Sequence, residues 1–207
     1  MSAEIRLIGL DGIPEARAGD RVSDLVVRGL EHDGLALAES AGGYVRGAEK
    51  YLTNFGVILA SDDVPTSQLA RANFYPQRRQ PWEIYVNAEA QRFVREDVPS
   101  VDAREQALRF QPVMRHWVVF DQSVVEQAPP LIEDWTTQDM LDAFESRLPC
   151  FYRAGSIEAL AQAAGLPEPA LAATLEAYNY GVHTGNDFLG RRHLPCKLVK
   201  PPFYAIR

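Results

Sequence analysis

The residues that could do acid–base, nucleophilic or metal chemistry are few and widely spaced. The chain has four histidines and two cysteines, and only two local pairs bring such residues close in sequence, His183 with Asp187 and His193 with Cys196. Neither pair repeats the spacing of a metal site, in which several ligands recur at short fixed intervals. Surface or core roles explain these side chains equally well, so the sequence predicts no metal site.

Motifs for nucleophilic and nucleotide chemistry are also missing from the sequence. There is no Gly-x-Ser-x-Gly elbow for a serine hydrolase. A Cys–His pair that uses Cys150 or Cys196 stays open, since such partners meet in space rather than in sequence. A dinucleotide cradle needs glycines between a strand and a helix, whereas Gly42, Gly43 and Gly47 follow a predicted helix and lack the GxGxxG spacing. The sequence therefore predicts no dinucleotide site within these residues.

The composition is that of a soluble domain with a core of its own. The 207 residues are 46% hydrophobic and 24% charged, with a formal net charge of −7. A chain of this length buries enough apolar surface to fold without disulfides or a structural metal. The acidic balance disfavours nucleic acid as a partner, and no apolar run is long enough to span a bilayer. Two cysteines and no secretory leader indicate the cytoplasm.

Apolar and alternating runs predict a small sheet. Residues 56–60 form a short apolar strand, and residues 82–87 alternate and are rich in β-forming side chains. We expect residues 92–94 to return beside them as the second arm of a hairpin. Residues 116–121 are apolar on both faces, which places them in the interior of the sheet. Residues 203–206 form a further apolar, strand-like run.

Capping residues and helical spacing predict several helices, most of them in the second half of the chain. Ser156 caps a helix over 157–164, which Gly165 ends. The other predicted helices run from about Asp33 to the double glycine, from Thr136 or Thr137 to about Leu148, and from about Pro169 to Tyr180. Together these elements predict an α+β fold, with a small mixed or antiparallel sheet and several helices.

The polar stretch from Ser61 to Pro81 shows no periodicity and predicts a long loop. Loops of this length are uncommon unless they line a site or are disordered. We therefore take residues 61–81 as the first candidate for a functional edge of the molecule.

Three stretches together resemble one protein family. Residues 81–96, PWEIYVNAEAQRFVRE, are similar to the P-x-x-I-x-V-N-x-x-G-x-R-F-x-x-E run of the fumarate reductase and succinate dehydrogenase flavoprotein family, which includes ketosteroid and tricarballylate dehydrogenases. The run departs from the family at Ala90, where the family has a hairpin glycine. Residues 33–38 resemble the family's G-D-G-x-x-M-A helix, and residues 165–206 follow its downstream run. The resemblance covers about residues 32–207.

In that family this stretch is mostly the substrate-capping domain, an α+β lid inserted into the FAD-binding domain. The resemblance implies a cap that closes over the flavin, excludes water and orients an organic substrate for hydride transfer. Residues 1–31 would then be a leader or a remnant of the FAD domain, 32–190 the cap, and 191–207 a return segment. FAD is implied for the full-length parent, held by an FAD-binding domain in cis or in trans. This chain would be a fragment that binds no cofactor and is not catalytic alone.

The family's acid–base residues carry over poorly. Fumarate reductases place a general-acid arginine just after the R-F-x-x-E stretch, where this chain has residues 99–102, PSVD. Arg104 is nearby and is our candidate for that role after a shift; the alternative is an arginine on a helix surface. The family's cap-strand histidine would fall near Asn54 or Phe55, and neither is histidine, so a dicarboxylate substrate is disfavoured.

Ketosteroid dehydrogenases use a tyrosine of the cap, for which this chain offers Tyr75 or Tyr85. We take Tyr75 as the candidate, because Tyr85 is better explained as strand packing. Two other functions stay open. One is a free-standing module that keeps the cap fold and uses the 61–81 loop to bind a small molecule or a protein. The other is an unrelated hydrolase with a cysteine or histidine centre.

Overall fold

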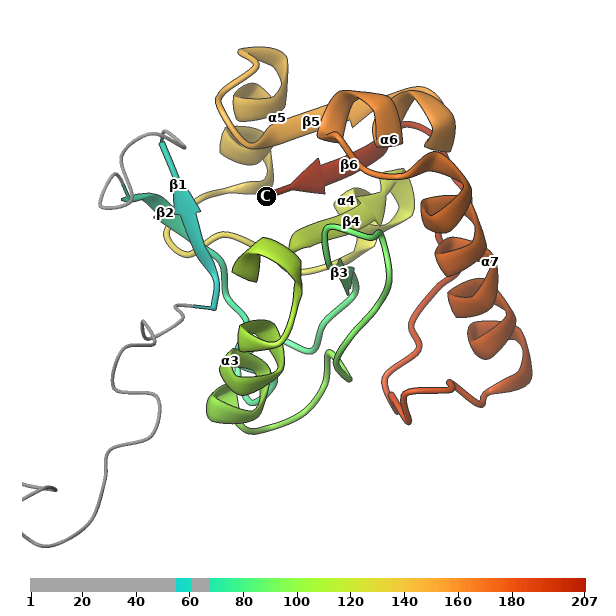
Figure 1. The fold of residues 1–207 in the computed structure, drawn as a ribbon. Coiled ribbons are helices and arrows are strands. Elements are labelled where there is room, and N and C mark those ends of the chain that lie inside the picture. The colour runs from blue at the N-terminus through green and yellow to red at the C-terminus, as the bar shows by residue number, and fades with distance from the viewer. Residues whose placement is uncertain (1–54, 61–67) are drawn as a thin grey trace, which may run out of the picture. The chain divides into compact units, whose positions relative to one another are not determined.

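Four antiparallel strands form the central sheet of the protein. The computed structural model describes residues 55–60 and 68–207, so the predictions for residues 1–54 and 61–67 lie outside the described residues, including the helix expected near Asp33. The strands lie in the order β3 (Ile84–Val86), β4 (Trp117–Asp121), β6 (Phe203–Ile206) and β5 (Phe151–Ala154) (Figure 1). Helices and this antiparallel sheet confirm the predicted α+β class.

The two middle strands are the most apolar ones. Every side chain of β4 and β6 is buried, whereas the edge strand β5 alternates between buried and more exposed positions. Val118 of β4 lies opposite Ile206 of β6, and Asp121 lies opposite Phe203. A strand with partners on both sides and covered faces reads as a continuous apolar run. The prediction of an interior strand over residues 116–121 is therefore confirmed for 117–121, while His116 precedes the strand.

The predicted hairpin over 82–94 is wrong in its second arm. β3 does form, but it pairs with β4, and residue 92 makes only an isolated bridge to Val86. The side chain of Asn87 accepts hydrogen bonds from the backbone N–H groups of Glu89 and Gln91 at 3.0 and 2.9 Å. Such a side-chain turn competes with strand pairing and ends the strand. Apart from this bridge Arg92 takes no part in strand pairing, and its side chain points to buried carboxylates described below.

The expectation of a strandless loop from 61 to 81 is also wrong in part. Residues Gln68–Arg71 form β2, which pairs antiparallel with β1, Val57–Leu59. β2 is short and buries only Ala70 fully, so it carries no alternating apolar signal. The strand exists because β1 offers an edge, and that edge cannot be read from residues 68–71 alone.

Capping chemistry predicted the helices of the second half well. α6 runs Ile157–Ala164, with Ser156 accepting from the N–H of Ala159 and Gly165 at φ +68° closing its end. This matches the prediction at both ends. α5 (Thr137–Glu145) begins with a capping box on Thr136 and ends three residues earlier than expected. α7 (Glu168–Thr184) continues past the expected end at Tyr180.

Three helical segments were not predicted: α3 (Val101–Arg109), the single 3-10 turn Pro112–Met114, and α4 (Gln122–Gln127). α4 begins at Asp121, the last residue of β4, whose carboxylate accepts from the N–H groups of Ser123 and Val124. The other carboxylate oxygen of Asp121 accepts hydrogen bonds from the backbone N–H groups of Val199 and Lys200, which precede β6. One buried carboxylate therefore ends a strand, starts a helix and holds the approach to the next strand.

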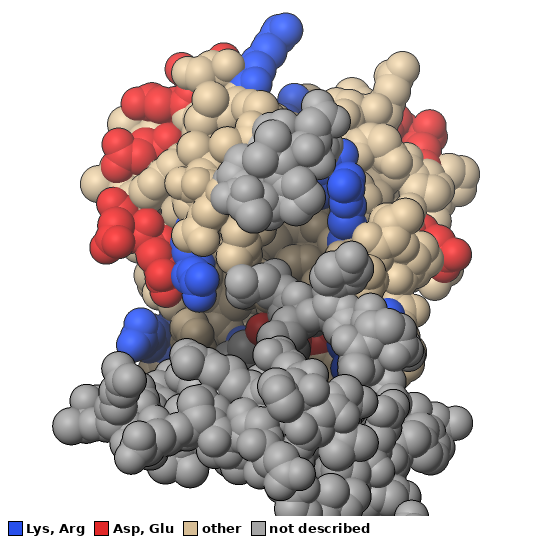
Figure 2. Space-filling view, turned by 60° about the vertical axis from the view of Figure 1, so that its left-hand side comes forward, with Lys and Arg blue, Asp and Glu red and all other residues tan. Residues whose placement is uncertain are grey.

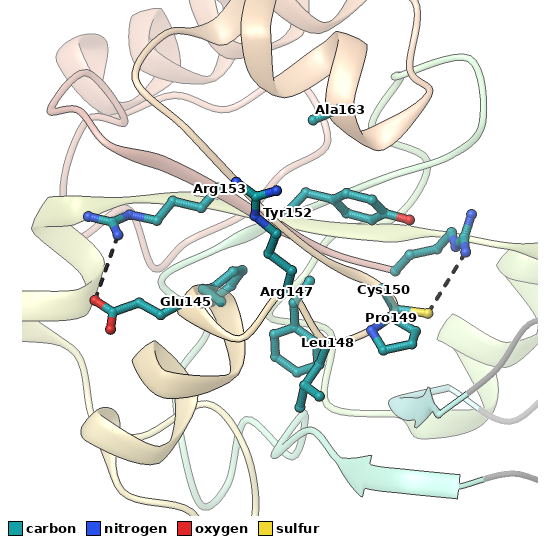
Figure 3. Close-up of a pocket in the computed structure, with 11 residues that line it drawn as sticks. Glu145, Arg147, Leu148, Pro149, Cys150, Tyr152, Arg153 and Ala163 are labelled. Carbon is teal, nitrogen blue, oxygen red and sulfur yellow. Dashed lines mark hydrogen bonds and ion pairs between the residues drawn. The ribbon is translucent and has the colours of Figure 1, made fainter.

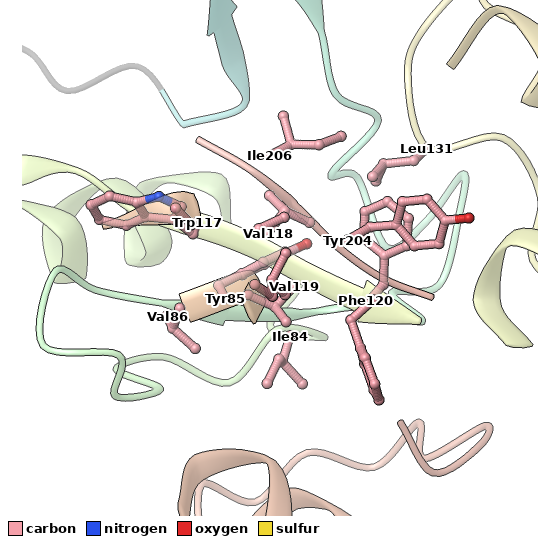
Figure 4. Packing of buried hydrophobic residues seen from close by; sticks show 14 of the residues in the cluster. Ile84, Tyr85, Val86, Trp117, Val118, Val119, Phe120, Leu131, Tyr204 and Ile206 are labelled. Atoms are coloured by element: carbon pink, nitrogen blue, oxygen red, sulfur yellow. The ribbon is translucent and has the colours of Figure 1, made fainter. Parts of the chain in front are cut away.

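Aromatic side chains fill the core between the sheet and α5. Tyr204 stacks on Phe120 with ring centroids 5.2 Å apart, and Phe144 of α5 meets Tyr204 edge-on at 4.9 Å. Figure 4 shows buried apolar side chains of β3, β4 and β6, which alternate between the two faces of the sheet. The surface charge is unevenly distributed. On the face that carries β1 and β2, acidic side chains lie along the two sides and basic side chains lie nearer the middle (Figure 2).

Candidate functional site

Three charged residues of the 81–96 motif form a buried network with Arg79 and with the loop that follows α7. We call this group the ionic cluster. All of its side chains are almost completely excluded from solvent, and its members are Arg79, Glu83, Arg92, Glu96, Asp187 and Arg191.

Arg92 is the centre of the ionic cluster. Its Nε and Nη2 donate to the two carboxylate oxygens of Glu96 at 2.7 and 2.6 Å, and its Nη1 donates to Asp187 at 2.5 Å. Arg191 lies 3.5 Å from Glu96 and donates to the backbone carbonyl of Glu83 at 2.7 Å and to that of Pro81. The cluster therefore ties the loop after α7 to the strand β3.

The ionic cluster is balanced in charge, with three arginines and three carboxylates. Burial lowers the pKa of Arg92, but hydrogen bonds and the charge of Glu96, followed by those of Asp187, outweigh burial and raise it above its ordinary value. Burial would raise the pKa of Asp187, but Arg92 and backbone N–H groups outweigh burial and lower it. Each arginine of the cluster lies within ion-pair distance of a carboxylate, so we interpret the cluster as a structural one.

A second group combines aromatic rings with a buried cation. We call it the arginine–aromatic cluster, and it consists of Phe55, Phe74, Tyr75, Tyr85, Arg104 and His116. Its members come from the segment before β1, the segment after β2, β3, α3 and the residue before β4.

Arg104, a predicted site residue, is 1% exposed on α3, so the alternative of a helix-surface arginine is wrong. Its Nη1 donates to the carbonyl of Val98 at 3.0 Å, and its guanidinium carbon lies 5.7 Å from the ring centroid of Phe55. Its buried Nε has no hydrogen-bond partner among the described residues. Burial lowers the pKa of Arg104, and the charges of Tyr85 and Tyr75 act in the opposite direction. Arg104 is a buried cation, and no carboxylate within residues 55–60 and 68–207 forms an ion pair with it.

The two candidate tyrosines differ in exposure. Tyr85 is 1% exposed in β3, and its hydroxyl donates to Glu83 at 3.3 Å; burial and then the charge of Glu83 raise its pKa well above 10.0. This supports the view of Tyr85 as strand packing. Tyr75 is 37% exposed, and the guanidinium carbon of Arg78 lies 5.5 Å from its ring. Tyr75 directly follows Phe74, whose ring centroid lies 4.8 Å from that of Tyr85, so Tyr75 borders the cluster that contains Arg104.

His116 belongs to this site and was missed as a site residue by sequence reasoning. Its ring stacks on Phe55 at 4.2 Å with an interplanar angle of 10°. Burial lowers the pKa of His116 to about 4, so the ring is neutral near pH 7. The family resemblance places a histidine near Phe55 in the sequence, where this chain has none. His116, the residue before β4, lies beside Phe55 in space instead. No local signal links the two residues.

The other residues considered for chemistry lie apart from each other. His183 ends α7, while Asp187 is held in the ionic cluster. Burial raises the pKa of the Cys196 thiol to about 11, which keeps the sulfur protonated and a poor nucleophile. Both cysteines are free thiols, and Cys150 is buried. Within 55–60 and 68–207, no three His, Cys, Asp or Glu side chains are grouped as metal ligands are.

The described part of the chain does not fit an FAD phosphate cradle. Such a cradle uses a glycine-rich turn between a parallel strand and a helix. Every strand pair in the described ranges is antiparallel, and α4 follows β4 through Asp121, whose carboxylate would repel a phosphate. None of the helices in these ranges is both long and apolar enough to cross a membrane.

Comparison with known proteins relates this α+β unit to flavoproteins. The chain has partial homology to fumarate reductase flavoproteins and ketosteroid dehydrogenases, over about 60 to 75% of its own length. It is 27% identical over 125 residues to a probable fumarate reductase of Shewanella frigidimarina, which is 60% of this chain and 19% of the relative. The chain thus spans about a fifth of the length of that curated relative. No protein-family model matches it.

Solved structures share the fold at lower identity. The open conformation of a flavocytochrome c3 fumarate reductase matches 75% of this chain and 24% of its own, with a TM-score of 0.55 and 23% identity. A 3-ketosteroid Δ1-dehydrogenase of Sterolibacterium denitrificans matches 75% of this chain and 31% of its own, with a TM-score of 0.53 and 22% identity. A fumarate reductase flavoprotein subunit structure from Lactobacillus plantarum matches 74% of this chain and 92% of its own, with a TM-score of 0.50 and 21% identity.

Proposed function

We propose that this chain is the substrate-capping part of an FAD-dependent oxidoreductase, and that another stretch of protein, in cis or in trans, holds the flavin. The cap covers the flavin, excludes water and orients a small organic substrate. The cap is placed at residues 32–190 and a return segment at 191–207. That division stays a prediction, and β6 at Phe203–Ile206 lies in the same sheet as β3, β4 and β5.

The observation that carries this proposal is the partial sequence match to a probable fumarate reductase, which is confined to 19% of that relative. The fold match to the Lactobacillus plantarum structure, of which 92% is covered, supports a unit that folds with its own core. The antiparallel sheet, which does not fit a dinucleotide, supports a division of labour in which the cofactor is bound elsewhere.

Tyr75 and Arg104 are the residues that we propose for the substrate side of the cap. Tyr75 is accessible and can donate its hydroxyl proton to a substrate atom that becomes basic during the reaction. Arg104 is a buried cation of the same cluster, and in this proposal its charge stabilises the phenolate that remains when the proton leaves. Arg104 therefore acts as a positioning and electrostatic residue.

A chimera tests the capping role. Residues 55–207 replace the matched stretch in the Shewanella frigidimarina relative, and a second protein carries only a short linker there. We expect both proteins to retain flavin, and dye-coupled turnover over a panel of organic acids and ketosteroids to be restored only in the chimera. A chimera that binds flavin fully, but is no faster than the linker protein, contradicts the proposal.

The residue roles are tested in the same chimera. Tyr75→Phe removes the proton and keeps the ring, so kcat falls by about 100-fold or more while KM stays nearly unchanged. Arg104→Lys keeps the charge and retains more turnover than Arg104→Gln. Equal turnover of the Tyr75→Phe protein and the unmodified chimera removes Tyr75 from the site.

A further inference from the structure

An open pocket lies away from both clusters, beside α5, β5 and α6. It is bounded by the loop that joins α5 to β5, by the end of α6 and by Arg207, and its volume is about 740 Å³ (Figure 3). Pockets of a few hundred to a thousand Å³ hold ligands of drug size. None of its lining residues belongs to the ionic cluster or to the arginine–aromatic cluster.

Cationic side chains dominate the charge of this pocket. Arg147, Arg153 and Arg207 line it, against a single acidic residue, Glu145. Glu145 approaches Arg153 only at 4.0 Å, and both side chains are substantially exposed, at 65% and 44%. An exposed pair at that distance is weak and screened by salt, so an anion can replace Glu145 as the partner of Arg153. This surplus of positive charge stands out in a chain whose formal net charge is −7.

The rest of the lining is apolar and aromatic. Arg207 lies 5.9 Å from the ring centroid of Tyr152, and its Nη2 is 3.9 Å from the sulfur of Cys150. The apolar side chains that line the pocket are Phe144, Leu148, Phe151 and Ala163. A ligand suited to this lining carries a negative group at one end and an apolar body.

Two residues of the loop that builds this pocket have a left-handed backbone conformation. Arg147 has φ +52° and Cys150 has φ +71°, and neither is glycine. A left-handed residue with a side chain costs about 1–2 kcal/mol, and such strain tends to gather at functional sites. Figure 3 shows the side chain of Arg147 extending from this loop, and the side chain of Arg153 extending toward Glu145.

We propose that this pocket binds a small organic oxyanion, a carboxylate or a phosphate monoester with an apolar body. The guanidinium groups of Arg147 and Arg153 hold the anionic group by paired N–H donors, as guanidinium forks do with planar and tetrahedral oxyanions. Arg207 adds positive charge, and the ring of Tyr152 with Leu148 contacts the apolar part.

Calorimetric titration of the 207-residue chain tests this site. The probes are phenyl phosphate and 4-phenylbutyrate, and their neutral counterparts are phenol and 4-phenylbutyramide. We expect at least one anion to bind, more weakly at higher salt, and the neutral compounds not to bind. Binding of phenyl phosphate alone or of 4-phenylbutyrate alone identifies which oxyanion the pocket takes.

Variants locate the binding. Arg147→Gln and Arg153→Gln each weaken it by about tenfold, and the double variant abolishes it. Arg147→Lys keeps the positive charge but loses the paired N–H donors. We expect its affinity to lie between that of the unmodified protein and that of Arg147→Gln. Arg109→Gln, an exposed arginine at the end of α3, is the matched control and leaves binding unchanged. Equal affinity in the double variant, equal binding of a neutral compound, or no binding of either anion at millimolar concentration overturns the proposal.

Discussion

His116 makes the stability of the protein depend on pH. Its pKa is about 4 in the folded protein and 6.5 as the ordinary value, because burial disfavours the charged ring. Between these values the unfolded chain binds the proton and the folded chain does not. The stabilisation is therefore complete above pH 6.5 and is lost as pH falls toward 4. The loss amounts to roughly 3 kcal/mol. Urea unfolding at a series of pH values measures it.

A comparison with His116→Phe isolates this effect. The phenyl ring keeps the stack on Phe55 and removes the titrating group. Asp187, whose pKa is lowered in the fold, adds a loss in the same direction at lower pH, so the slope of the unmodified protein alone does not identify His116. If the variant keeps the full slope between pH 4 and 6.5, the buried neutral histidine is not its source.

Ala90 occupies a turn position that suits glycine. It is fully buried and has φ +58°, and its carbonyl accepts from the hydroxyl of Thr174 at 2.7 Å. The left-handed backbone costs alanine more than glycine, although glycine gives the unfolded chain more freedom. We expect Ala90→Gly to raise the free energy of unfolding by up to about 1 kcal/mol. Ala88 lies in the same turn but has no positive φ, so we expect Ala88→Gly to lower the free energy of unfolding. An Ala88→Gly protein that is more stable than the unmodified one contradicts the explanation by backbone conformation.

Sequence reasoning found single site residues but not their surroundings. Tyr75 and Arg104 were chosen by resemblance, and both lie in the arginine–aromatic cluster. The burial of Arg104 could not be foreseen, because α3 is polar and was not predicted as a helix. Ser100 at its N-cap was the one available signal, since its side chain accepts from the N–H of Ala103 at 3.2 Å. The contact of His116 with Phe55 depends on tertiary structure alone.

The ionic cluster is an element-level joint between β3 and the loop after α7. Removing Arg92 leaves the carboxylates of Glu96 and Asp187 buried without their shared partner. We expect Arg92→Met to lower the free energy of unfolding by about 3–5 kcal/mol. Chemical denaturation followed by circular dichroism measures the change.

Lys200→Met is the matched control for that prediction. Lys200 pairs with Glu126 at 2.6 Å, but both side chains are about half exposed. Solvent screens such a pair, so its loss changes the unfolding midpoint little. Similar midpoints for the two variants would show that burial of the ionic cluster contributes no stability.

Elements with local chemistry were predicted better than those defined by a distant partner. α6 has Ser156 and Gly165 at its ends, and both signals stand in the sequence beside the helix. β5 was missed because it is short, has one fully buried side chain, and pairs with a strand about fifty residues later. β2 was also missed, because it becomes a strand by pairing with β1, and residues 68–71 alone carry no sign of that partner.

At the level of the whole molecule, the chain is expected to hold no FAD by itself. The described sheet is antiparallel and offers no phosphate cradle, and the sequence carries no GxGxxG run. Purified chain should be colourless, and added FAD should keep its fluorescence and pass freely through a dialysis membrane. A yellow protein with flavin in a one-to-one ratio contradicts the proposed division of labour.

The order of strands across the sheet has a consequence for biosynthesis. β6 lies between β4 and β5, yet it follows β4 by about eighty residues in the sequence. While the ribosome is still making α5, α6 and α7, β6 is absent. The backbone hydrogen-bonding groups on that edge of the apolar strand β4 then have no partner. Nascent chains with an unpaired apolar strand edge bind chaperones or aggregate. Translation pauses placed before residue 203 should therefore harm the yield of native protein more than pauses placed after it.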